Sequence, residues 1–423
     1  MHKLTITLKQ HTPLIHFQHD QDGATLRASE VKPKLDRYIL TKLGNGKYEE
    51  GVRQAEAKHW LVGKGEHPAL DYKMRIEESS VVIWELKKDT GKINSKTRKP
   101  IVNTIPLYFG NMNNSFPKKM LFCPKPIKLE FYSSCEDLIK TIERYKDSFF
   151  LLNNFGTRQT KGFGSFLPER KSVEPNIHKD HVKFRIDFSN QDFGTWDCFF
   201  DLFTALDFFY KTLRSGINQN DVYFKSLMYF YALDVKAYWD KRAIRYEFEH
   251  FTPNRQQDKG EQTDFDNDGD YRIDNARLFR DMLGLSSSQT WKSYNDDLIT
   301  KDYISDEQDG KIERFKSPLL IKPVYNNRGF DVYIFPSSIP EMLLGAQFSI
   351  SSKNRARSFM MSTPEQFDTN DFLRFITDEN TVTFVIDTMD EIILTAEKER
   401  KFKAVKIAKT LRSIYNNIEY VEM

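Results

Sequence analysis

A glycine-rich loop at residues 156–166 has the residue types and spacing of a ligand-binding segment. Its sequence is Gly-Thr-Arg-Gln-Thr-Lys-Gly-Phe-Gly-Ser-Phe. Three glycines allow positive φ angles and let a ligand approach the backbone amides closely. The two basic side chains attract phosphate, and the phenylalanine between the last two glycines offers a stacking face for a base. The residues that we expect to contact such a ligand are Gly156, Arg158, Lys161, Gly162, Phe163, Gly164 and Ser165.

The loop does not match a nucleotide-phosphate signature. The pattern Gly-x-x-x-x-Gly-Lys-Ser/Thr needs a lysine after Gly162, and Phe163 stands there. ATP is therefore not the predicted ligand. We expect the side chains of Arg158 and Lys161 to lie outside the core, because they stand among glycines. A tight turn that binds nothing is the alternative interpretation.

A group of histidines near the N-terminus is the best candidate for catalysis. It consists of His11, His16 and His19, followed by Asp20 and Asp22. A histidine that titrates near neutral pH can take a proton from a ribose 2′-hydroxyl, as metal-independent RNA cleavage requires. Neither the spacing nor the number of ligands matches a known metal site. A polar loop after a strand explains the same residues, so we predict no catalytic residue, no metal site and no cofactor.

Three further charged segments each have a functional and a plain interpretation. The run Asp264–Asp270 resembles the start of a calcium loop, but Asn275 at its twelfth position lacks the bidentate carboxylate, so a solvated acidic loop is preferred. The segment Glu397–Arg412 predicts a basic amphipathic helix, which is either solvated or contacts RNA backbone or an acidic partner. Arg355 and Arg357 predict a second, weaker phosphate-binding loop.

Composition describes the kind of protein that carries these segments. The chain has 423 residues, 39% of them hydrophobic, with a net charge of +3. This length favours two domains, and the small net charge requires local basic patches for any nucleic-acid binding. Three cysteines are too few for a disulfide framework. Because no window reaches the ~20 apolar residues of a membrane helix, we expect a cytoplasmic protein without a membrane partner.

Periodicity predicts an order of strands and helices that occurs twice. Alternation predicts a strand at Lys3–Leu8, and three- and four-residue spacing predicts a helix at Glu136–Leu152, directly before the glycine-rich loop. After a linker with two prolines, the order begins again with a strand at Val182–Phe188 and a helix at Phe199–Leu213. We predict a first domain at 1–172, with an insertion at about 44–100, and a second domain at 180–423 with a helical insertion.

Shorter segments complete this prediction. Strands are expected at Pro318–Val324, Asp331–Phe335 and Val382–Ile386 in the second half. Inside the insertion, Val81–Trp84 is strand-like, and Lys87–Lys99 predicts a solvated basic loop.

Three motifs resemble the RAMP superfamily of CRISPR-Cas proteins. The string GTRQTKGFGSF resembles the loop G-S/T-R-x-x-R/K-G-F/Y-G-S of that superfamily. Leu26-Arg27-Ala28-Ser29 is similar to a helix start, and Arg314–Leu319 resembles an R-F-x-S-P-L strand entry, both in the two-domain RAMP subunit of the type III-B Cmr effector complex. Pro33 and Lys34 depart from that pattern, since the family favours small residues there.

The resemblance implies an α+β fold of two ferredoxin-like (RRM-like) domains, with the glycine-rich loop closing the first. It implies a non-catalytic subunit of a type III CRISPR effector complex in antiviral defence, with guide RNA, target RNA and other subunits as partners. Arg27 and Lys34 then join the loop as expected RNA contacts. Two alternatives stay open. One is a metal-independent CRISPR RNA-processing endoribonuclease with His16 or His19 as base, and the other is an interaction protein whose basic helix docks another subunit.

Overall fold

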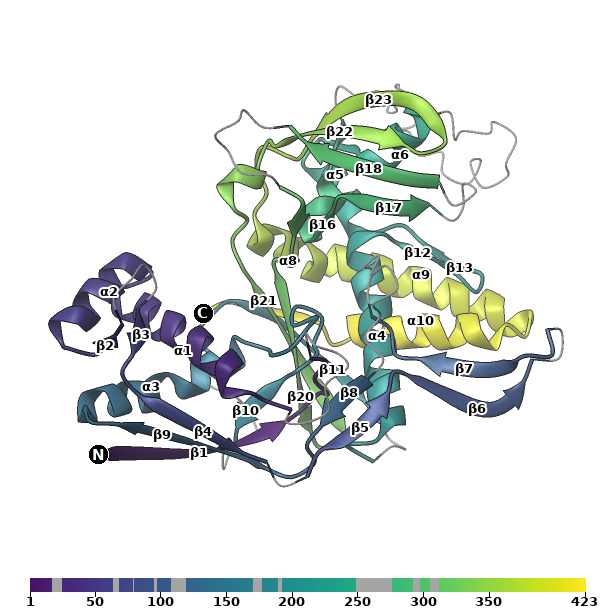
Figure 1. The fold of residues 1–423 in the computed structure, drawn as a ribbon. Helices are drawn as coiled ribbons and strands as arrows, with labels where there is room; N and C mark the ends of the chain where they lie inside the picture. Colours follow the sequence, from purple (N-terminus) through teal and green to yellow (C-terminus); the bar gives the residue numbers. More distant parts are fainter. Residues whose placement is uncertain are drawn as a thin grey trace.

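The structure is a computed structural model of the chain (Figure 1). It describes residues 1–16, 25–63, 68–78, 80–94, 97–107, 119–169, 177–188, 192–248, 276–291, 297–304 and 312–423. Helices and several small sheets both contribute, which confirms the predicted mixture of α and β structure. No helix in these ranges is long and apolar enough to cross a membrane.

A four-stranded antiparallel sheet organises the first half of the chain. Its strands lie in the order β10 (Phe166–Pro168), β1 (His2–Gln10), β9 (Ile127–Ser133) and β4 (Lys73–Glu77). Strand β1 pairs with β9 over most of its length, with Leu4 opposite Phe131 and Leu8 opposite Ile127. The alternation that predicted a strand at Lys3–Leu8 is therefore confirmed.

Two helices pack on one face of this sheet (Figure 1). Helix α1 (Ala28–Leu43) buries Leu35 and Ile39, and helix α3 (Glu136–Leu151) buries Ile142 and Phe149. The spacing of apolar residues in α3 is the one that the sequence predicted. Their apolar side chains form one core with those of the sheet.

The predicted insertion contains regular elements of its own. Helix α2 (Tyr48–Ala57) and the short strands β2 (Leu61–Val62) and β3 (Ala69–Leu70) precede β4, which joins the sheet just described. Strand β5 (Val82–Glu85) pairs with β8 (Lys119–Phe122), as the strand-like residues there predicted. The prediction of a basic loop at Lys87–Lys99 is wrong, because β6 (Lys87–Ile93) and β7 (Pro100–Thr104) form an antiparallel hairpin.

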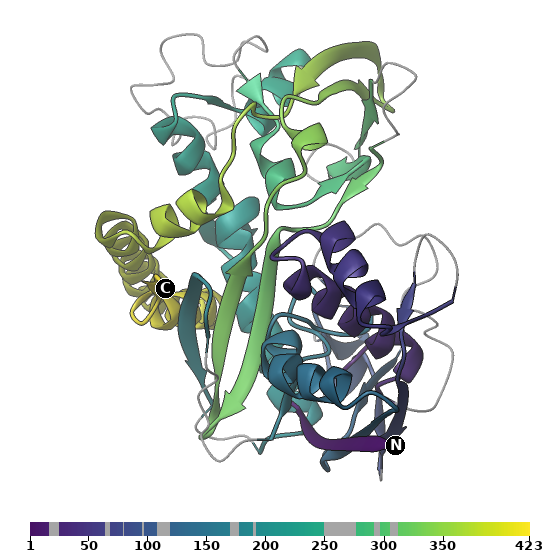
Figure 2. The ribbon, with the colours of Figure 1, turned by 90° about the vertical axis from the view of Figure 1, so that its left-hand side faces the viewer.

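A second four-stranded antiparallel sheet organises the other half. Its strands lie in the order β20 (Leu319–Asn326), β21 (Gly329–Pro336), β11 (His181–Asp187) and β24 (Glu419–Val421). Helices α4 (Trp196–Arg214) and α10 (Phe402–Tyr415) belong to its core, where Phe184, Phe209 and Tyr415 are buried together. Figure 2 shows the long β20–β21 hairpin between the elements of the first half and the paired helices near the C-terminus.

Two predictions near the C-terminus are wrong. Val382–Ile386 lies in helix α9 (Glu379–Lys398) and not in a strand, because Asp378 caps the helix by accepting from the Asn380 amide and Val385, Met389 and Ala396 share its buried face. The predicted basic helix at Glu397–Arg412 is split. Arg400 adopts a φ of 55°, which separates α9 from α10.

The remaining elements form the upper part of Figure 1. A six-stranded sheet contains β14 (Tyr238–Trp239), β15 (Ala276–Arg277), β23 (Arg355–Ser362), β22 (Gln347–Ser352), β18 (Asp297–Tyr303) and β17 (Ser288–Trp291), in that order. The other elements there are α5 (Leu227–Asp234), α6 (Asp240–Glu247), α8 (Thr369–Thr377), two 3₁₀ turns (Phe279–Leu283 and Glu341–Leu343) and the strand pairs β12 (Ile217–Gln219) with β13 (Val222–Phe224) and β16 (Leu285–Ser286) with β19 (Arg314–Phe315).

Candidate nucleic-acid interface

The glycine-rich loop lies along strand β20, so it joins the two halves of the chain. Lys161 and Ile321 form a parallel bridge, and the amide of Ile321 donates to the carbonyl of Thr160 at 3.3 Å. The hydroxyl of Ser165 donates to the carbonyl of Pro323 at 2.8 Å. The loop and the strand that follows the Arg314–Leu319 motif are therefore direct neighbours.

The backbone of the loop has the positive φ angles that its glycines predicted. Gly156, Gly162 and Gly164 have φ angles of 77°, 88° and 67°. The space beside them is occupied by this chain. A Cβ on Gly164 would lie 2.0 Å from the carbonyl oxygen of Phe155, and one on Gly162 would lie 3.0 Å from the Pro323 ring. At these two positions, the missing side chains let the protein pack against itself.

The ring of Phe163 is fully buried in the core of the second half. It stacks on the ring of Phe203 in α4, with the centroids 3.8 Å apart. In this conformation both rings are used for packing.

The two basic side chains of the loop both contact this chain. The Nζ atom of Lys161 is buried, lies 3.1 Å from the centroid of the Tyr210 ring and has no hydrogen-bond acceptor among the described residues. Burial lowers the pKa of Lys161 well below its usual value, and the nearby charges of Arg214 and Arg158 lower it further. Arg158 donates to the carbonyl of Leu107, and burial lowers its pKa. The prediction that both side chains lie outside the core is wrong for Lys161, because its Nζ is buried against Tyr210 of α4, whereas Arg158 is half-buried.

The two basic residues of α1 differ in what they contact. Lys34 donates to the carboxylate of Glu30 at 3.2 Å, to the carbonyl of Asn154 at 3.1 Å and to Gln159 at 3.0 Å. Burial lowers its pKa, and Glu30 partly opposes this shift. Lys34 therefore ties α1 to the start of the loop. Arg27, which precedes α1, is partly exposed and makes no ion pair with a described residue.

The histidines and the acidic run are described only in part. His11 and His16 are both buried. The amide of Tyr325 donates to Nδ1 of His11 at 3.0 Å, and burial lowers the pKa of His11 well below 6.5. His19, Asp20, Asp22 and the run Asp264–Asp270 lie outside the described residues. Within the described ranges, no group of three or more His, Cys, Asp or Glu side chains has the arrangement of a metal site.

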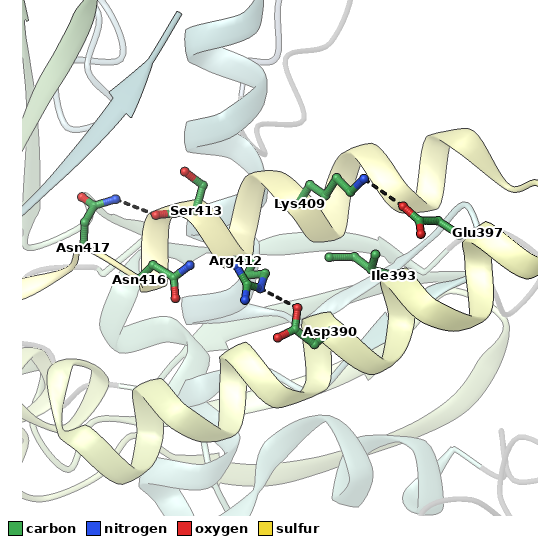
Figure 3. A pocket seen from close by; sticks show the side chains of 8 residues that line it. All are labelled: Asp390, Ile393, Glu397, Lys409, Arg412, Ser413, Asn416 and Asn417. Carbon is green, nitrogen blue, oxygen red and sulfur yellow. Dashed lines mark hydrogen bonds and ion pairs between the residues drawn. The ribbon is translucent and has the colours of Figure 1, made fainter.

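Helices α9 and α10 enclose an open groove of about 610 Å³ (Figure 3). Inside it, Lys409 pairs with Glu397 at 2.8 Å and Arg412 pairs with Asp390 at 2.5 Å. On another side of α10, Lys406 pairs with Asp201 of α4 at 3.3 Å. These ion pairs neutralise much of the positive charge of the predicted basic helix. Arg357 likewise pairs with Glu247 at 2.6 Å, and it lies in strand β23 instead of the predicted loop.

Comparison with known proteins identifies the family. Residues 1–217 match the family model of the Cmr1 N-terminal domain, and residues 223–416 match that of the Cmr1 C-terminal domain. The chain belongs to the Cmr1 family. This confirms the resemblance, drawn from three short motifs, to the RAMP subunits of the type III-B Cmr complex.

One solved structure similar to this Cmr1-family chain is the crystal structure of Cmr1 from Pyrococcus furiosus in its apo form. The two chains share 10% sequence identity with a TM-score of 0.31, and the match covers 89% of this chain and 96% of the other. A comparison with curated proteins found no match.

Proposed function

We propose that this Cmr1-family chain binds CRISPR guide RNA, alone or paired with its target, as a non-catalytic subunit of a cytoplasmic type III-B effector complex. The observation that supports the proposal best is the match to both Cmr1 domain families, which together span nearly the whole chain. Guide and target RNA and the other subunits of the complex are its proposed partners.

We also propose that the two four-stranded sheets are the cores of two ferredoxin-like domains, at residues 1–172 and 180–423. In each sheet the first strand in chain order lies between the third and the fourth, and the second strand is at the edge. In each, a helix follows the first strand and another helix precedes the fourth. This order fits the β-α-β-β-α-β motif on which many RNA-binding domains are built.

Within the first domain, we propose that RNA runs past the start of α1 and the glycine-rich loop. Arg27 is the proposed phosphate contact, because it is partly exposed and unpaired among the described residues. Two hydrogen bonds hold the glycine-rich loop against the first turns of α1, near Arg27. Lys34 donates to the carbonyl of Asn154, and the amide of Gly156 donates to Glu30 at 2.6 Å. Phe163 and Lys161 fix the loop from the inside.

Binding of labelled single-stranded RNA by the purified full chain tests this function. We expect fluorescence anisotropy to rise with protein concentration, and the RNA to stay intact for hours in EDTA and in magnesium. Arg27→Ala should weaken binding and lower the salt dependence by about one phosphate contact. Arg144→Ala, an exposed arginine on α3, serves as the control. Absence of RNA binding by the wild-type chain would contradict the proposal, and RNA cleavage lost in His16→Ala would favour the processing endonuclease.

A further inference from the structure

The β6–β7 hairpin is exposed on both of its faces. Three of its apolar side chains, Ile93, Ile101 and Val102, are 65%, 39% and 46% exposed. An isolated two-stranded ribbon is at best marginally stable in water. No described residue covers either face along most of its length, so the hairpin presents a free surface.

The hairpin is strongly basic. Between residues 87 and 104, the described charged residues are one acid, Asp89, and five bases, Lys87, Lys88, Lys92, Arg98 and Lys99. Lys88 pairs with Asp197 at 2.7 Å. The other four bases make no ion pair with a described residue. This local excess of positive charge contrasts with the net charge of only +3 for the whole chain.

The hairpin and helix α10 are anchored to the same turns of α4. Lys88 binds Asp197 and Lys406 binds Asp201, and these two acids are four residues apart on α4. Residues four apart on a helix share one face. Figure 1 shows the hairpin running below α10.

The beginning of α10 adds an aromatic ring to this region. Phe402 is 80% exposed, which is far more than any other described phenylalanine. Lys401 and Lys403 flank it. Lys401 pairs with Glu399 at 2.5 Å and with Asp221 at 3.6 Å, whereas Lys403 is exposed without an ion pair to a described residue. An exposed ring beside an unpaired cation is an arrangement on which bases of single-stranded nucleic acids stack.

We propose that the β6–β7 hairpin and the first turn of α10 form one surface that binds single-stranded RNA. The lysines and the arginine of the hairpin contact phosphates, and Phe402 stacks on a base. The unpaired bases of the hairpin identify the occupant as a polyanion, and the exposed ring beside Lys403 favours RNA over an acidic protein. The proposal rests on the proposed function, and it places an RNA contact apart from the glycine-rich loop.

A charge-reversal experiment on the full chain tests this surface. Variant one carries Lys92→Glu, Arg98→Glu and Lys99→Glu, and variant two carries Phe402→Ala. The control carries Lys47→Glu, Lys73→Glu and Arg144→Glu, which are also exposed and unpaired among the described residues but lie elsewhere in the chain. The probe is a fluorescein-labelled oligouridine of about 20 nucleotides, titrated at several salt concentrations. Melting temperatures of all variants establish that they are folded.

We expect variant one to bind at least tenfold more weakly than the control. The salt slope, which is the change of log affinity with log salt concentration, should fall in magnitude by about 2, since each of three lost phosphate contacts contributes ~0.7. Variant two should bind about fivefold more weakly with an unchanged salt slope, because stacking releases no counterions.

Three results would overturn the proposal. If the wild-type chain binds the probe and variant one matches the control in affinity and slope, the surface does not bind RNA, although the proposed function stands. If variant one binds the probe like the control but no longer copurifies with other Cmr subunits, this surface binds a protein and not RNA. If the wild-type chain does not bind the probe at all, the proposed function fails together with this surface.

Discussion

Phe163 of the glycine-rich loop and Phe203 of α4 stack face to face, with centroids 3.8 Å apart and planes 7° apart. In the sequence, Phe163 lies just before strand β10 of the first sheet. Its ring is nevertheless buried in the core of the second half. This stacked pair therefore couples the conformation of the loop to the position of α4. A loop that we predicted to bind a ligand with its side chains uses them to hold two halves together.

Replacing Phe163 by Ala should destabilise the fold. Loss of a fully buried phenyl ring typically costs about 3 to 5 kcal/mol, from lost burial and the cavity that remains. Urea unfolding of Phe163→Ala measures this loss. Phe402→Ala, which removes an exposed ring of the same type, should leave the free energy of unfolding nearly unchanged. Equal stability of Phe163→Ala and wild type, with RNA binding lost, would mean that the ring leaves the core to meet RNA.

Two buried lysines should respond in opposite ways to replacement by methionine. Lys322 donates to the carbonyls of Phe150, Asn153 and Phe166, whereas Lys161 has no acceptor among the described residues. Lys322→Met removes the donor from three hydrogen bonds, two of them buried, and should cost about 3 kcal/mol or more. Lys161→Met leaves an unbranched side chain on the Tyr210 ring, and its stability should change by less than about 1 kcal/mol. Thermal unfolding compares both variants, and similar losses would contradict this difference.

Substitutions at two glycines distinguish the cost of backbone strain from the cost of a steric overlap. Gly164 and Gly46 have φ angles of 67° and 96°, but only Gly164 has atoms within 4 Å of an added Cβ. Gly46→Ala should therefore cost the conformational penalty alone, about 1 to 2 kcal/mol. Gly164→Ala should cost clearly more, because its Cβ would overlap the carbonyl of Phe155. Equal costs in urea unfolding would show that the loop can move away from Phe155.

Local patterns predicted the parts of the fold that depend on local sequence. The alternation of Leu4, Ile6 and Leu8 gives strand β1 one buried face, and the apolar spacing in Glu136–Leu151 gives α3 its stripe. The glycines of the loop likewise indicated the positive φ angles that they adopt. In each case the cause lies within a few residues of the effect.

The surroundings of the candidate site could not be predicted in this way. Lys161 meets Tyr210 about fifty positions later and Ile321 far beyond it, and no local pattern encodes those contacts. The β-branched residues around Val382 favour a strand locally, but the cap at Asp378 and burial against α10 make them helical. For the β6–β7 hairpin, the signal was the row of bases with few apolar partners, which predicts exposure correctly but not strand pairing.

His11 should make the stability of the chain depend on pH. Its Nδ1 accepts from the Tyr325 amide, so the folded state holds the neutral ring, and burial with the charges of Lys9 and Lys322 lowers its pKa well below 6.5. In the unfolded chain His11 titrates near 6.5. Between the two pKa values only the unfolded state binds the proton. The contribution of His11 to the free energy of unfolding is therefore fully present above pH 6.5. It is lost as the pH falls below 6.5, by up to about 1.4 kcal/mol per pH unit.

The variant that tests this dependence is His11→Asn, because the asparagine amide oxygen can still accept from Tyr325 but does not titrate. Urea unfolding between pH 7.5 and about 5 should give a shallower slope for His11→Asn than for wild type, with similar stability at the upper end. His2→Asn, at an exposed position, should keep the wild-type slope. His181 also has a pKa lowered by burial, so His11→Asn should remove only part of the slope. A slope identical to wild type would mean that His11 binds equally many protons in the folded and the unfolded chain, so that burial does not hold its ring neutral.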